Sequence, residues 1–261
     1  MIDLDGVIWC GTQALEGSAW AVAKLREHNR RVLFATNNSA FGVHDILEKL
    51  EKMGIEADVG DLATSAQAAA LLLEPGQTVL ACSGRGLKEI LADRGVKVYT
   101  PDDDAAILPE RNVDAVVVGW HKDFNFKSLT LATRCVLKGS RLIGTNEDAT
   151  YPSTDGILPG GGALVAAVAY ASATQAIIAG KPHDPFINLL RQCGVVGESA
   201  VEMVVGDRVS TDGILAKKLN ADFSLVLSGV TSSEDVSRSI HSQERALDTA
   251  DSLAQVVSRI L

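Results

Sequence analysis

The sequence predicts an α/β fold in which a doubly wound parallel sheet carries an inserted second α/β unit. Short runs rich in β-branched residues alternate with helix-length amphipathic segments along most of the 261 residues, a pattern typical of parallel sheets covered by helices. The stretch 61–162 repeats this alternation within itself. We therefore expect 1–60 and 163–261 to form one core domain and 61–162 to form an inserted domain.

The elements follow from this alternation in chain order. Met1 and Ile2 form the end of a first strand. Because ligands bind beyond the carboxyl ends of strands in such sheets, polar residues at those ends are the candidate functional residues. The other expected strands are Arg31–Thr36, Thr78–Ser83, Val113–Gly119, Arg141–Thr145, Ala176–Ala179, Val201–Gly206 and Phe223–Leu227. The expected helices lie near 18–29, 42–53, 64–73, 86–94, 127–138, 161–172, 184–193, 211–219 and 248–260.

Composition and charge argue against several classes of protein. Apolar residues make up 46% and charged residues 22%, which is ordinary for a folded globular chain. The formal charge of −9 disfavours a binder of nucleic acid or anionic membrane, which would need a basic face. The scattered cysteines suit reduced thiols. Without a signal-like segment or an uninterrupted apolar span, we expect a cytoplasmic protein.

The first strand ends in two carboxylates, Asp3 and Asp5, followed by Gly6. Residues two apart in an extended segment point to the same side, so both carboxylates would share one small space. Such a pair suits a divalent cation, or a division of labour between nucleophile and acid/base. A polar strand end that opens a turn is the alternative explanation, since Asp and Gly are common turn formers.

Two further strand ends offer groups for an anion. Thr36, Asn37 and Asn38 follow the strand RVLFAT and supply a hydroxyl and two amides ahead of a helix. A helix N-cap is the alternative there. Lys181 follows the strand AIIAG and precedes Pro182, which keeps it outside the next helix. A lysine in that position can neutralise a phosphate, although most lysines only face solvent.

The strand VEMVVG ends in Asp207, and Asp212 follows at the start of a helix. Asp212 would suit the helix N-terminus through the macrodipole alone. A carboxylate that closes a buried strand, as Asp207 does, must be solvated, paired or bound to a metal.

The insertion contains a polar loop after one of its own strands, where a parallel sheet presents ligand contacts. Asn146, Asp148 and Tyr151 lie on this loop and are candidate substrate contacts. Tyr151 combines an aromatic ring with a hydroxyl, so it can pack on a substrate and also form a hydrogen bond. Packing within the insertion, or a contact between subunits, would explain Tyr151 equally well.

Taken in order, DLDGV, TNNS, GKP and GDRVSTD resemble the four motifs of the haloacid dehalogenase superfamily of phosphatases. VVVGWHKDFNF, TNEDATYPSTDG and LPGGGALVAAV resemble the large α/β cap of its NagD and p-nitrophenylphosphatase branch. The resemblance runs from Ile2 to about Val230. It implies a Rossmann-like catalytic core, a cap that selects the substrate, and hydrolysis of a small phosphorylated metabolite, with a possible homodimer through the cap.

The resemblance also implies roles for the acidic residues. Asp3 is expected to be the nucleophile that becomes an aspartyl phosphate, and Asp5 the general acid and base. Asp207 is expected to bind Mg²⁺ together with Asp3 and the backbone carbonyl of Asp5. Asp212 is expected to orient magnesium-bound water or Lys181.

The phosphate-binding roles implied by the resemblance fall to Thr36, Asn37 and Asn38, with Lys181 as the charge neutraliser. Three features depart from the family pattern. Only two residues precede Asp3, His121 replaces an acidic residue in the cap, and Glu16 stands where proline is common.

Two other activities use similar residues. A phosphoryl-accepting signalling module also gathers acids, a threonine and a lysine around magnesium, but without an insertion of this size. An enzyme of the same fold could instead cleave a carbon–halogen or a carbon–phosphorus bond. Asp5 argues against dehalogenation, because a halide needs no proton from a carboxylic acid.

Overall fold

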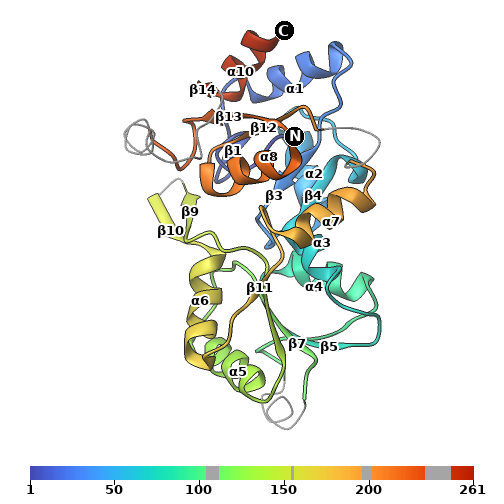
Figure 1. Ribbon diagram of the computed structural model, residues 1–261, viewed down its shortest axis with the longest axis vertical. Coiled ribbons are helices and arrows are strands. Elements are labelled where there is room, and N and C mark those ends of the chain that lie inside the picture. Colours follow the sequence, from blue (N-terminus) through green and yellow to red (C-terminus); the bar gives the residue numbers. More distant parts are fainter. Residues whose placement is uncertain (104–111, 154–155, 196–200, 233–247) are drawn as a thin grey trace.

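The computed structural model describes residues 1–103, 112–153, 156–195, 201–232 and 248–261. Two parallel sheets with helices on their faces make up most of it, one in the upper and one in the lower half of Figure 1. The predicted α/β class and the parallel sheets are confirmed.

The first sheet is built around Ile2. Ile2 forms parallel bridges with Phe34 on one side and Val205 on the other. It thereby joins the pair β4–β3 to the set β12–β13–β14, so the predicted first strand lies in the centre of the sheet. The strands are β3 (Phe34–Thr36), β4 (Leu62–Thr64), β12 (Met203–Gly206), β13 (Asp222–Val226) and β14 (Asp248–Ala250).

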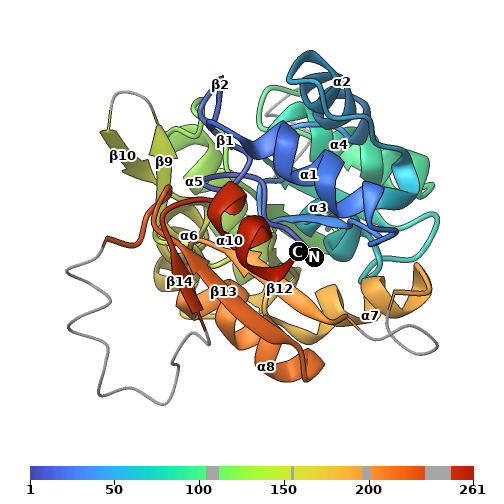
Figure 2. The ribbon, with the colours of Figure 1, turned by 90° about the horizontal axis from the view of Figure 1, so that it is seen from above.

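Helices cover both faces of this sheet because alternate residues of its strands point to opposite sides. Phe34 faces one core and its neighbours Leu33 and Ala35 face the other. Helices α1, α2 and α10 pack on the Phe34 side, and α1 contacts α10, as Figure 2 shows. The helices of the two faces are α1 (Ser18–Glu27), α2 (Val43–Lys52), α3 (Ser65–Ala70), α7 (Asp184–Gln192), α8 (Ile214–Leu219) and α10 (Leu253–Ile260).

The second sheet has the order β11–β8–β7–β5–β6. Its strands alternate in the same way: Val116 and Val118 face α5 and α6, whereas Ala115 and Val117 face the core that contains α3 and α4. Its elements are β5 (Thr78–Cys82), α4 (Arg85–Asp93), β6 (Lys97–Tyr99), β7 (Ala115–Val118), α5 (Phe126–Leu137), β8 (Arg141–Gly144), α6 (Gly161–Ser172) and β11 (Ile177–Ile178).

The strand pairing indicates where the insertion begins and ends. β4 pairs with β3 of the first sheet, whereas α6 and β11 pack on or pair with β8 of the second. We therefore propose an insertion from about residue 65 to about residue 180, in place of the predicted 61–162. Residues of both sheets share one apolar core around the alanine-rich α3, so the two units are packed together.

Short elements complete the chain. The segment expected to be helical from 248 begins instead as strand β14, because residues 248–250 pair with β13. Of the described helices, none is long and apolar enough to cross a bilayer. The remaining elements are the hairpin β1 (Trp9–Cys10) and β2 (Gln13–Ala14), the hairpin β9 (Thr150–Ser153) and β10 (Gly156–Pro159), the 3₁₀-helix Val59–Asp61 and the π-helical turn Val209–Gly213.

Candidate active site

The carboxyl ends of the first sheet and strand β9 border a small cavity of about 40 Å³. It has room for on the order of three waters, or for a group the size of a phosphoryl. The sequence-predicted residues that line it are Asp3, Asp5, Thr36, Asn37, Asn38, Asn146, Asp148, Tyr151 and Lys181.

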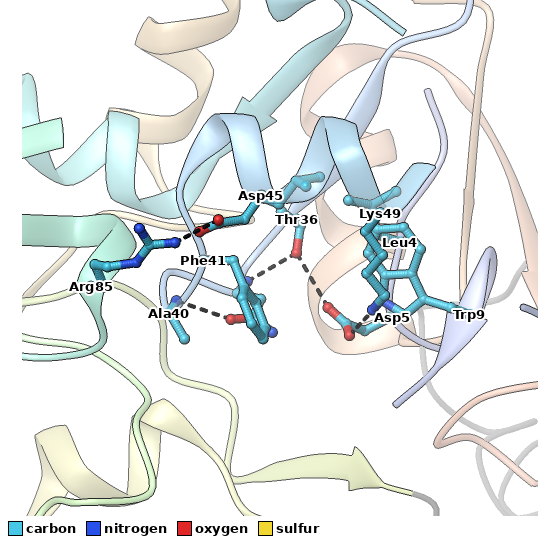
Figure 3. A pocket seen from close by; sticks show the side chains of 11 residues that line it. Leu4, Asp5, Trp9, Thr36, Ala40, Phe41, Asp45, Lys49 and Arg85 are labelled. Carbon is cyan, nitrogen blue, oxygen red and sulfur yellow. Dashed lines mark hydrogen bonds and ion pairs between the residues drawn. The ribbon is translucent and has the colours of Figure 1, made fainter. Parts of the chain in front are cut away.

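The Asp5 carboxylate is held by three donors, of which Figure 3 shows Trp9 and Thr36. Its Oδ1 accepts from Trp9 Nε1 at 2.9 Å and from the Tyr151 hydroxyl at 3.0 Å. Among the described residues, Oδ2 accepts only from Thr36 Oγ1, at 3.5 Å. Burial and the neighbouring Asp5 raise the pKa of Tyr151, so its hydroxyl remains a donor. Oδ2 is therefore the oxygen better placed to exchange a proton with a ligand.

Lys181 lies at the centre of the acidic residues. Its Nζ donates to Asp3 Oδ1 at 2.8 Å, to Asp212 Oδ1 at 2.7 Å and to the Ala35 carbonyl at 2.9 Å. The side chain is only 2% exposed. Burial acts to lower the pKa of Lys181, but the carboxylates of Asp212 and Asp3 outweigh burial and raise it. For Asp3 the effect of burial has the opposite sign: it raises the pKa of the carboxyl group, and the Lys181 ammonium opposes that effect.

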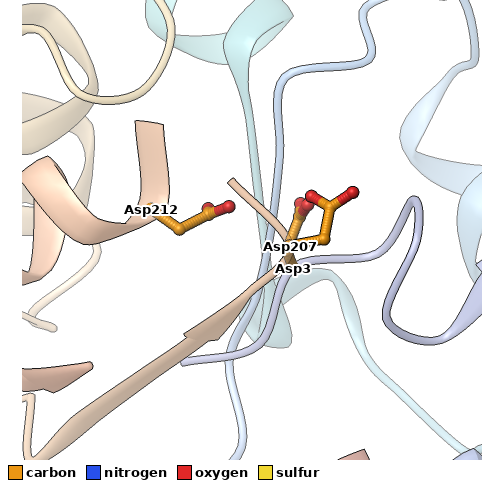
Figure 4. Close-up of side chains that lie close together, drawn as sticks. All are labelled: Asp3, Asp207 and Asp212. Atoms are coloured by element: carbon orange, nitrogen blue, oxygen red, sulfur yellow. The ribbon is translucent and has the colours of Figure 1, made fainter. Parts of the chain in front are cut away.

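Asp3, Asp207 and Asp212 gather three carboxylates in one place (Figure 4), with ligand atoms within 4.8 Å of one another. Asp207 Oδ2 accepts the Val230 N–H at 2.7 Å, but the buried Oδ1 has no hydrogen-bond partner among the described residues. Burial and the nearby Asp212 raise the pKa of Asp207 to about 7. Three carboxylates against one ammonium leave a negative, all-oxygen site, which suits a hard divalent cation.

Two glycines permit this close packing. A Cβ on Gly6 would lie 2.5 Å from Asp207 Oδ2, and Gly6 has a φ of +85°, a conformation that L side chains rarely adopt. A Cβ on Gly206 would lie 2.2 Å from Asp212 Cγ. The sequence indicates the turn at Gly6, whereas these contacts depend on distant parts of the chain.

The Asn37 side chain connects the two units. Its Oδ1 accepts the Lys181 N–H at 2.8 Å, and its Nδ2 donates to Asp148 Oδ2 at 3.0 Å. Asn146 Nδ2 donates to the Asn37 carbonyl at 2.7 Å. Because its side chain forms these contacts, Asn37 acts as framework here, and its contact with phosphate stays a prediction. Burial raises the pKa of Asp148, and Arg208 opposes that shift.

Other residues at the site were missed by the sequence reasoning. Trp9 donates to Asp5, and Trp120 stacks on Tyr151 with ring centroids 4.5 Å apart. Arg208 donates to the Thr150 carbonyl at 2.7 Å and lines the cavity. Arg208 directly follows Asp207, and this position is the sequence signal that could have indicated Arg208 as a residue of the site.

Two residues of the inserted unit, Tyr151 and His121, lie at different distances from the site. Tyr151 reaches Asp5, whereas His121, the residue that departs from the family pattern in the cap, does not line the cavity at Asp5. Its ring lies edge-on to Phe124 at 5.8 Å.

Two family models and a phosphatase relative match this chain. A family model described as haloacid dehalogenase-like hydrolase matches residues 1–97, and a second, HAD-hydrolase-like model matches residues 178–256. The acid sugar phosphatase of Staphylococcus saprophyticus is 33% identical over 241 residues, which is 91% of this chain and 89% of that protein.

Solved structures share the fold over nearly the whole chain. The p-nitrophenyl phosphatase from Archaeoglobus fulgidus superposes with a TM-score of 0.85 and 28% identity, covering 99% of this chain and 97% of that one. The glycerol phosphate phosphatase from Mycobacterium tuberculosis, solved with magnesium, has a TM-score of 0.83 and 29% identity, covering 98% of this chain and 75% of that one.

Proposed function

This chain belongs to the haloacid dehalogenase-like hydrolases, and we propose that it is a magnesium-dependent phosphatase of small phosphate monoesters that works through an aspartyl phosphate. The observation that carries the proposal is Lys181, buried between Asp3 and Asp212 and close to Asp207, whose Oδ1 has no hydrogen-bond partner within the described parts of the chain. The substrate classes that we consider are phosphoglycolate, glycerol phosphate, sugar phosphates, nucleotides and p-nitrophenyl phosphate.

In the first step an oxygen of Asp3 attacks phosphorus, and the bond from phosphorus to the ester oxygen breaks. Asp5 gives its proton to that oxygen, which leaves as an alcohol. Lys181 and Thr36 line the cavity. The Thr36 hydroxyl can donate to a phosphoryl oxygen, and the Lys181 ammonium, whose three donors go to Asp3, Asp212 and Ala35, supplies positive charge beside it. Covalent catalysis thus divides a very slow reaction into two steps.

In the second step water attacks the phosphorus of the aspartyl phosphate. Asp5 takes a proton from that water, and the bond between phosphorus and the Asp3 oxygen breaks, so that inorganic phosphate forms and both carboxyl groups return to their first state. Trp9 and Tyr151 hold Asp5 through Oδ1 during both transfers.

The residues present fit a magnesium ion. The buried Oδ1 of Asp207 lacks a partner among the described residues, and Asp3 supplies a second carboxylate nearby. Asp3, Asp207 and the Asp5 carbonyl would hold the ion, with Asp212 orienting its water or Lys181. When bound, magnesium neutralises negative charge on the phosphoryl oxygens.

Incubation with p-nitrophenyl phosphate, with magnesium or with a chelator, tests the proposal. We expect continuous release of phosphate that needs the metal. A single equivalent of phosphorylated protein without turnover would indicate a signalling module instead. Release of halide or cleavage of a phosphonate, without ester hydrolysis, would assign a different bond to the site.

We also propose a cytoplasmic protein that forms a homodimer through its inserted unit. The support for the dimer is a set of exposed apolar side chains on that unit, and analytical ultracentrifugation tests it. These side chains are Phe126, Leu137, Ile157 and Tyr170.

A further inference from the structure

A second cavity, of about 370 Å³, adjoins the small one at Asp3, and the mechanism above does not use it. The two cavities share Asp5, Thr36 and Asn38. The small cavity has room for little more than a phosphoryl group, whereas the larger one lies within the range of small-molecule pockets, roughly 300–1,000 Å³.

The position of Asp5 connects the two cavities chemically. A general acid must reach the ester oxygen, which lies between the phosphorus and the rest of the leaving group. A phosphoryl group at Asp3 would therefore direct the leaving group past Asp5 and into the larger cavity. We propose that this cavity receives the leaving group and that Lys49 binds an anionic substituent on it. This inference rests on the proposed phosphatase function.

The lining suits a short carbon skeleton (Figure 3). Leu4, Trp9 and Ile46 are buried and supply apolar surface, while Phe41 is 44% exposed. Asp5 and Trp9 lie at one side of the cavity and Arg85 lies at the other.

The two cations of the lining differ in their partners. Arg85 pairs with Asp45 at 2.6 Å and with Glu89 at 3.1 Å, and its side chain is 69% exposed. Lys49 donates to the Gly11 carbonyl at 2.8 Å. In the part of the chain that the structure describes, no carboxylate lies within ion-pair distance of Lys49.

The Lys49 ammonium also lies 3.7 Å from the centroid of the Trp9 ring. An ammonium has three donors, so Gly11 and the ring face leave one for a ligand. Trp9 in turn donates to Asp5, so a single indole separates the Lys49 ammonium from the general acid. A small leaving group that spans the width of this indole could therefore place a carboxylate or a second phosphate at Lys49 while its ester oxygen lies at Asp5.

The test compares phenyl phosphate with 4-carboxyphenyl phosphate, two esters that differ by one anionic group. Wild type, Lys49→Met and Lys49→Arg are assayed for kcat/KM on both. Lys52→Met is the matched control, because Lys52 lies on the same helix, is 71% exposed and pairs with Glu48 outside the cavity. The two esters differ in intrinsic reactivity, but this difference is the same for every variant. It therefore cancels when the ratio of the two kcat/KM values is compared between variants.

We expect Lys49→Met to lower kcat/KM for the carboxylated ester at least tenfold more than for phenyl phosphate, the size of one lost charge-assisted hydrogen bond. Lys49→Arg should retain most of the preference, and Lys52→Met should behave as wild type. Equal losses on both esters, or no loss on either, would overturn the role of Lys49. If wild type hydrolyses neither ester, the phosphatase proposal itself fails, which is a separate result.

Discussion

Replacing Asp207 with asparagine should stabilise the metal-free protein while abolishing its response to magnesium. Burial and Asp212 raise the pKa of Asp207 from 3.8 to about 7. The folded state therefore binds more protons than the unfolded state between these values, so stability falls as pH rises through this window, and the penalty is complete above about pH 7. At 1.36 kcal/mol per pKa unit the penalty is roughly 4 kcal/mol.

An asparagine removes this charge and keeps the contacts. Its Oδ1 can accept the Val230 N–H, and its amide N–H groups can take the position of the oxygen that has no partner among the residues the structure describes, beside Asp3 and Asp212. Recovery of even half of the penalty, about 2 kcal/mol, should raise Tm by roughly 5 °C in a chain of this size. The gain should be largest at about pH 8 and should vanish below about pH 4.

Thermal unfolding in chelator, and then in magnesium chloride, measures both effects. Magnesium should raise the Tm of wild type by mass action and leave that of Asp207→Asn unchanged. The exposed Asp123→Asn serves as a surface control. A variant less stable than wild type in chelator at about pH 8 would refute the electrostatic reasoning. An equal response to magnesium in both proteins would refute the metal site.

Three other substitutions and conditions test the remaining parts of the site. Asp5→Asn should reduce kcat/KM, which reports the step in which the leaving group departs, far more for alkyl phosphates than for p-nitrophenyl phosphate, because an alkoxide needs the proton that a nitrophenolate can do without; equal losses in kcat/KM would argue against the acid. Tyr151→Phe removes a donor to Asp5 and should lower kcat for alkyl phosphates about tenfold, with a smaller loss on p-nitrophenyl phosphate; unchanged kinetics would make Tyr151 a packing residue. Burial lowers the pKa of Lys49 to about 8 while Asp5 opposes it, so the preference for 4-carboxyphenyl over phenyl phosphate should fall as pH rises through about 8; a flat ratio in the pH series would contradict a charged Lys49.

The sequence predicts the core of the site because its signals are local. A strand that ends in Asp3, Thr36 or Asp207 can be recognised from adjacent residues, and the parallel sheet then brings these ends together. The pairing of Lys181 with Asp212 was one of two roles left open for that acid. The structure has this pairing, at 2.7 Å.

The parts that could not be predicted depend on contacts between distant segments. The proposed edges of the insertion depend on β4 and β11, which are only a few residues long and whose apolar pattern does not indicate which sheet they join. The contacts of Trp9 with Asp5 and with Lys49 require a turn and a helix to meet. The strand at 248–250 is too short to separate from the helix that follows it.

If Asp3 carries the phosphoryl group during turnover, the aspartyl phosphate can be trapped chemically. Asp5→Asn protein, mixed with p-nitrophenyl phosphate and magnesium and quenched in acid, should accumulate the aspartyl phosphate, because this leaving group departs without a proton whereas the group that activates water is missing. Borohydride reduction followed by peptide mass spectrometry should then find homoserine at position 3, and Asp3→Asn should show neither the label nor turnover. Phosphoryl label on any other residue, or turnover by Asp3→Asn above a trace, would show that Asp3 is not the nucleophile.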